Sequence, residues 1–81
     1  MSKRSLVESV LSLLDIEEIE KLKAQYPNGD EEKLSFNESQ NEEEREELLE
    51  EWLDSIKWKF LEEFKIELYN EIKYKIKWDL S

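Results

Sequence analysis

Carboxylates are the side chains of this chain with the widest range of possible chemistry. The 81 residues include 22 Asp and Glu against 12 Lys and Arg, a net charge of −10, and no His or Cys. Paired carboxylates can act as acid and base in glycoside hydrolysis, or bind divalent cations. With so many acids, close pairs arise by chance, and the twelve-residue calcium-loop pattern does not occur. We therefore expect no enzyme, no metal site and no cofactor.

The missing residue types exclude other chemistries. Without Cys there is no disulfide or iron–sulfur cluster, and without His there is no nucleophile–histidine pair. The single glycine, Gly29, is too few for a phosphate-binding loop. Three Trp, three Tyr and three Phe argue against an acidic disordered chain. We expect one small helical domain over residues 1–81.

The excess negative charge lies in residues 30–54, which hold twelve acids and two bases. On a helix, six of these carboxylates share one side, which we call the acidic face: Glu43, Glu46, Glu47, Glu50, Glu51 and Asp54. Like charges four residues apart destabilise a helix by roughly 0.2–0.5 kcal/mol per pair. A helix selected only for solubility would alternate Glu with Lys, and this one does not.

Three interpretations of the acidic face compete, although the missing calcium-loop pattern weighs against the second of them, a divalent-cation site. It is a solvated surface balanced across space by lysines of residues 57–77, a divalent-cation site, or a surface that binds a basic, nucleic-acid-binding protein. A row of carboxylates imitates duplex DNA, which carries a charge per about 1.7 Å of its axis. In charge and size the chain is similar to small viral inhibitors that act as DNA mimics, a similarity of type that rests on no motif. We favour a regulator or inhibitor.

The sequence predicts a mainly α fold for the elements that position the acidic face. Helical spacing predicts a helix over residues 3–26 that is kinked or broken near Asp15, followed by a turn at Pro27–Gly29. Residues 30–41 read as a polar loop. Asn41, with Glu44 three residues later, predicts the start of a long C-terminal helix from about residue 42.

The last third of the chain is ambiguous. Residues 56–60, 64–68 and 72–76 each alternate apolar and charged side chains, which is the period of a strand. A three-strand meander would fit, but its three-residue loops contain no glycine. We therefore favour helix as far as residues 68–72, with a possible short β segment at 72–80.

A long helix that is apolar on several sides must be buried on several sides. This predicts a homo-oligomer whose self-association residues are Leu49, Trp52, Ile56, Phe60 and Phe64. The alternative function is accordingly structural, as a self-assembling component of an oligomer or scaffold.

Two further partners are not expected. Lysines interleaved with aromatics over residues 52–78 are typical of single-strand nucleic-acid platforms, but the net charge of −10 opposes direct binding of nucleic acid. A membrane span is not expected, since no apolar stretch reaches the required length of about 20 residues. Surface association is not expected either, since the acids after the N-terminal segment, Asp15, Glu17, Glu18 and Glu20, disfavour anionic lipid. We expect a cytoplasmic protein.

Overall fold

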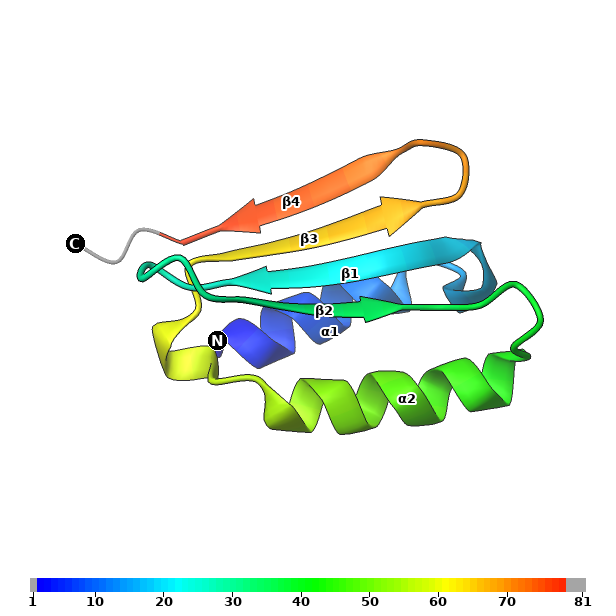
Figure 1. The fold of residues 1–81 in the computed structure, drawn as a ribbon, viewed down its shortest axis with the longest axis horizontal. Helices are drawn as coiled ribbons and strands as arrows, with labels where there is room; N and C mark the ends of the chain where they lie inside the picture. Colours follow the sequence, from blue (N-terminus) through cyan, green and yellow to red (C-terminus); the bar gives the residue numbers. More distant parts are fainter. Residues whose placement is uncertain (1, 79–81) are drawn as a thin grey trace.

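The computed structural model describes residues 2–78. Its elements, in chain order, are α1 (Lys3–Ser12), η1 (Ile16–Glu18), β1 (Ile19–Gln25), β2 (Glu31–Ser35), α2 (Glu42–Ser55), η2 (Trp58–Phe60), β3 (Glu63–Leu68) and β4 (Lys73–Lys77). The strands form one antiparallel sheet in the order β2-β1-β3-β4. Both helices lie on the same side of this sheet (Figure 1). The fold is α+β, so the predicted mainly α fold is wrong.

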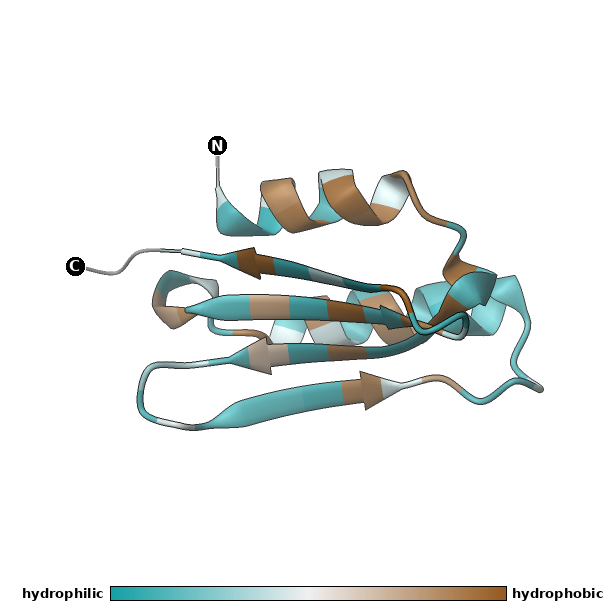
Figure 2. Ribbon diagram, turned by 90° about the horizontal axis from the view of Figure 1, so that it is seen from above, coloured by the Kyte–Doolittle hydropathy of each residue, from teal (hydrophilic) through white to brown (hydrophobic). Residues whose placement is uncertain are grey.

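Alternation of side chains builds the sheet. Leu22 and Ala24 of β1 and Phe64 and Ile66 of β3 are fully buried against the helices, and charged residues separate them. The resulting bands of apolar and polar residues run across the central strands in Figure 2. Because successive side chains of a strand point to opposite faces, the charged residues between them lie on the open face. Burial of one face fixes the register of every strand.

The first correction concerns residues 19–25, which form strand β1 where the helix predicted over residues 3–26 would have continued. Helix α1 ends at Ser12, and the Asp15 side chain accepts a hydrogen bond from the Glu17 N–H (3.0 Å) to begin η1. Ile19 and Leu22 looked helical because they are three residues apart. The register shift between Ile19 and Lys21 inserts one extra residue, so both side chains reach the core from a strand.

Residues 31–35 are also a strand, where a polar loop was predicted. The turn over residues 26–30 reverses the chain, with Gly29 at φ +91°, and β2 then pairs with β1. Leu34 is the only large apolar residue of β2, an edge strand of the sheet.

The predicted long C-terminal helix is likewise wrong beyond Ser55. Helix α2 does begin as predicted, because the Asn41 side chain accepts a hydrogen bond from the Glu44 N–H (2.8 Å). At its other end the Trp58 indole N–H donates to the Leu53 carbonyl (2.9 Å), and the chain enters η2.

The alternating residues beyond α2 form strands instead of continuing the helix. As strand β3, residues 63–68 hydrogen-bond to neighbours on both sides, β1 and β4. Of the three alternating blocks, 64–68 and 72–76 lie in or beside strands, whereas 56–60 forms the turn and η2. The possible β segment at 72–80 corresponds to β4, and its residues 79 and 80 lie outside the described residues.

Arg45 is a buried cation at the start of α2, 3% exposed. Its guanidinium donates to five backbone carbonyls at 3.0–3.2 Å: those of Ile16, Glu17, Ile19, Asn37 and Gln40. The rings of Phe36 and Tyr69 lie 5.2 and 5.8 Å from it. Within residues 2–78, no carboxylate pairs with this charge. Carbonyl dipoles and aromatic faces therefore replace its water.

We predict that Arg45→Met lowers the free energy of unfolding by about 3 kcal/mol, because it removes the guanidinium donor from five buried or partly buried carbonyls. Urea unfolding followed by far-UV circular dichroism measures the loss. Arg4→Met is the matched control, since it removes a guanidinium that binds exposed carboxylates and is expected to cost less than about 1 kcal/mol. Equal losses in the two variants would contradict the structural role assigned to Arg45.

Among residues 2–78, two residues in turns have a positive φ, and substitutions at them should have opposite effects on stability. Glu71 has φ +70° in the β3–β4 turn, where glycine is unstrained, so Glu71→Gly should raise the free energy of unfolding by about 1 kcal/mol. Gly29→Ala should lower it by a similar amount. An added Cβ at Gly29 meets nothing within 4 Å, so the loss would come from backbone strain alone. Thermal unfolding of both variants measures the pair.

Candidate interaction surfaces

The acidic face occupies the outer side of α2. All six of its predicted carboxylates are exposed, whereas Leu53 on the opposite side of the helix is 3% exposed and belongs to the core. Glu42 and Glu44 add two further exposed acids in the first turn. Helix α2 is roughly 21 Å long at 1.5 Å per residue. The structure therefore presents a straight row of carboxylates to solvent.

One cation from α1 meets this face. The Arg4 guanidinium lies 2.8 Å from Asp54, 3.2 Å from Glu50 and 2.7 Å from Glu8 of its own helix. The hydrogen bond to Glu8, followed by that to Asp54, raises the pKa of Arg4 above its ordinary value. Among the described residues, Glu43, Glu46, Glu47 and Glu51 form no ion pair. Neutralisation is confined to the C-terminal half of the face.

Seven of the ten lysines lie on the other side of the molecule, on the open face of the sheet, whereas Lys3, Lys57 and Lys59 do not. We call this surface the lysine face, and it comprises the outward side chains of the four strands: Lys21, Lys23, Gln25, Glu31, Lys33, Ser35, Glu63, Lys65, Glu67, Lys73, Lys75 and Lys77. Seven lysines and three glutamates give it a charge of +4. Helix α2 lies on the covered side of the sheet (Figures 1 and 2), and none of the ion pairs among residues 2–78 joins a lysine of this face to a carboxylate of α2.

Four lysines form one continuous row across the sheet. Lys23 is paired with Lys33 on one side and with Lys65 on the other, and Lys65 is paired with Lys75. Like charges directly opposite one another destabilise a sheet. Glu67, within 4 Å of Lys21, Lys23 and Lys73, and Glu63, 3.2 Å from Lys75, offset part of the repulsion. The described part of this face contains no aromatic residue on which a base could stack.

The predicted self-association residues are spread over several environments. Ile56 and Phe64 lie in the core, at 6% and 0% exposure, and Phe64 contacts the rings of Trp52 (5.7 Å) and Trp58 (6.1 Å). Leu49 and Trp52 are partly buried against the same core, and Phe60 is 59% exposed. These five residues form no common surface, and their role in self-association stays a prediction.

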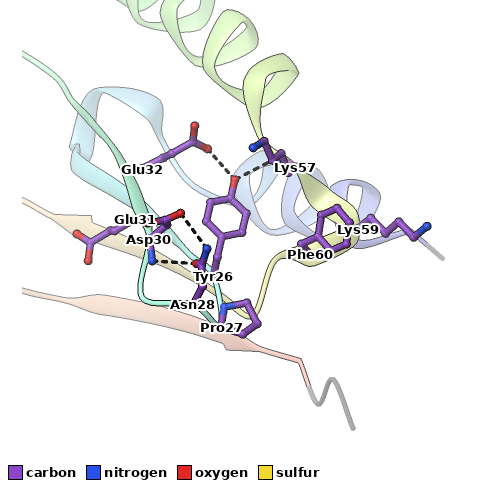
Figure 3. Close-up of a pocket in the computed structure, with 9 residues that line it drawn as sticks. All are labelled: Tyr26, Pro27, Asn28, Asp30, Glu31, Glu32, Lys57, Lys59 and Phe60. Atoms are coloured by element: carbon purple, nitrogen blue, oxygen red, sulfur yellow. Dashed lines mark hydrogen bonds between the residues drawn. The ribbon is translucent and has the colours of Figure 1, made fainter.

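An open pocket lies at the end of the molecule beside the β1–β2 turn, with a volume of about 750 Å³ (Figure 3). Tyr26 and Phe60 supply its aromatic surface. Asp30, Glu31 and Glu32 line the hairpin side, and Lys57 and Lys59 the other. The walls thus carry both signs of charge, and charge alone selects no class of ligand.

The Tyr26 hydroxyl links the two sides of this pocket by hydrogen bonds. It donates to the Glu32 carboxylate (2.7 Å) and accepts from the Lys57 backbone N–H (3.1 Å). Partial burial, followed by the hydrogen bond to Glu32, raises the pKa of Tyr26 above its ordinary value of 10.0. Nearby, the hydrogen bond from Gln25 and then that from Lys33 lower the pKa of Glu31.

Comparison of the chain with protein-family models, curated proteins and solved structures finds no match. Over residues 2–78, no group of three or more acidic side chains is arranged to hold a metal ion. In the same range, no helix has the length and apolarity needed to cross a membrane.

Sequence reasoning missed Arg45 and the lysine face. Nothing local distinguishes Arg45 from a surface arginine in an acidic helix. The alternation of Lys with apolar residues in the last third did carry a signal for half of the lysine face. The other half, on β1 and β2, was hidden by the irregularity after Ile19 and by the polar composition of β2.

We predict that the stabilising effect of Tyr26 disappears at alkaline pH. The folded chain holds the phenolic proton more tightly than the unfolded chain, so this stabilisation is complete below pH 10.0 and is lost as the pH rises through the raised pKa. The unfolding free energies of wild type and Tyr26→Phe should therefore converge above about pH 10. Urea titrations across that pH range measure the difference in unfolding free energy between the two proteins. Titration of the lysines cancels in this difference, because both proteins contain them. A difference that stays constant with pH would contradict the prediction.

Proposed function

We propose that the protein is a non-enzymatic interaction module, a regulator or inhibitor that binds a basic, nucleic-acid-binding protein through its acidic face. The observation that supports this most directly is the separation of charge. The acidic face stays exposed on helix α2, seven of the ten lysines lie on the open face of the sheet, and among residues 2–78 no lysine forms an ion pair with a carboxylate of α2.

The local energetics support the same proposal. Glu43, Glu47 and Glu51 are spaced four residues apart, and such like-charge pairs oppose helix formation. Helix α2 is held by other means, namely the Asn41 cap, buried Leu53 and Arg45. A carboxylate row that continues beyond the first turn, where its own helix gains nothing from it, is consistent with selection for an outside partner.

Binding of this kind depends on steering and charge complementarity. A row of carboxylates raises the association rate with a basic cleft and competes with nucleic acid for it. A basic partner is repelled by the lysine face, so it meets the molecule in one orientation. The proposal places the protein in the cytoplasm, where proteins that bind nucleic acid are accessible.

The test uses a defined basic probe, linker histone bound to a fluorescently labelled DNA duplex. Wild type should displace the duplex, and Glu43→Lys/Glu47→Lys/Glu51→Lys should do so at least about tenfold more weakly, because facing charge pairs are lost. Glu18→Lys/Glu20→Lys/Glu71→Lys is the matched control, with the same net charge but with exposed acids outside α2 exchanged.

Circular dichroism and thermal unfolding are used to check that both variants fold. The proposal is contradicted if wild type leaves the duplex bound. It is equally contradicted if the two variants displace the duplex alike, since net charge and not the acidic face would then be responsible.

A further inference from the structure

The lysine face is an unpartnered sheet face whose charge needs explanation. An open face adapted only to water would mix Lys with Glu and Thr across neighbouring strands. Here the row Lys33–Lys23–Lys65–Lys75 spans all four strands and lies roughly 14 Å from end to end at the usual strand spacing. Residues on four separate segments contribute, so the row is not the product of one biased stretch of sequence.

We propose that the lysine face binds the acidic face of a second copy of this chain. The complementary surface is present on the same molecule, as a row of carboxylates on a helix roughly 21 Å long. A nucleic acid is a weaker candidate, because the lysine face offers no aromatic side chain for stacking and the remainder of the chain repels phosphate.

The two faces lie on opposite sides of the molecule, and this determines the kind of assembly. A copy bound through its acidic face still exposes its own lysine face, and the first copy still exposes its acidic face. The contact is therefore heterologous and head-to-tail, and it leads to open-ended stacking rather than a closed dimer.

Geometry also predicts that the association is weak. Four strands of about five residues present roughly 320 Å² of projected sheet, below the ~800 Å² per partner of a standard interface. Two chains of net charge −10 also repel at long range. At about 0.1 M salt, distant charges are screened while facing charges at contact are screened less, so this ionic strength favours the contact.

The inference rests on the exposure of the acidic face, as does the proposed function, but not on a foreign partner. Binding of a second copy and binding of a basic protein compete for the same helix. A basic partner that binds the acidic face more tightly than a second copy does would therefore dissociate the assembly into single copies.

The test measures sedimentation equilibrium of the protein alone from about 10 μM to about 1 mM, a range that covers weak complexes. The average mass of wild type should rise with concentration. It should stay that of a monomer for a sheet variant, Lys33→Glu/Lys75→Glu, and for the helix variant Glu43→Lys/Glu47→Lys/Glu51→Lys. An equimolar mixture of these two variants should associate, since each supplies the charged face that the substitutions have neutralised in the other.

The control Glu18→Lys/Glu20→Lys/Glu71→Lys has the net charge of the helix variant but keeps both faces, and it should associate at least as strongly as wild type. If the sheet variant fails to fold by circular dichroism, Lys33→Gln/Lys75→Gln replaces it, because it removes charge without creating repulsion.

A monomeric wild type at every concentration overturns the inference, as does a folded sheet variant that associates like wild type. Failure here is distinguishable from failure of the proposed function, because the sheet variant retains its acidic face. If that variant displaces duplex DNA from the histone while wild type stays monomeric, the proposed function stands and this inference falls.

Discussion

The burial of Arg45 is the interaction on which the arrangement of α2 depends. A guanidinium removed from water is unstable unless its donors are satisfied, and here the acceptors are carbonyls from η1, from the start of β1 and from the loop before α2. A single side chain thus joins segments that are far apart in sequence. The aromatic faces of Phe36 and Tyr69 complete its surroundings.

The position of this cation also explains part of the acidity of α2. A positive charge in the first turns of a helix opposes the helix dipole, and Glu42, Glu43 and Glu44 in the first turn offset it. The acids further along, from Glu46 to Asp54, lie beyond the reach of that effect. The stability of the helix therefore accounts for the first carboxylates of the row. It does not account for those from Glu46 to Asp54, which the proposed function would explain.

The limits of sequence reasoning follow the range of the interactions. The cap at Asn41 and the turn around Gly29 depend on a few consecutive residues, and both were predicted correctly. The exposure of the carboxylates followed from helical spacing within α2. Strand β1 depends instead on pairing with β3, some 40 residues later, and on a bulge that imitates helical spacing. The burial of Arg45 requires carbonyls from three segments at once, and no local pattern encodes that.

The separation of acids and lysines onto two different faces is harder to explain by folding than the number of either residue type. Alternation along the strands dictates that some polar residue faces outward at each second position, but it does not dictate lysine in four neighbouring strands. Mixing the charges on each face would neutralise both more completely and remove the repulsion within each row. A molecule that keeps the two signs of charge apart has one negative face and one positive face. A charged surface that approaches it is therefore oriented by the electric field before contact. Orientation before contact matters for binding and for ordered stacking, whereas folding alone does not require it.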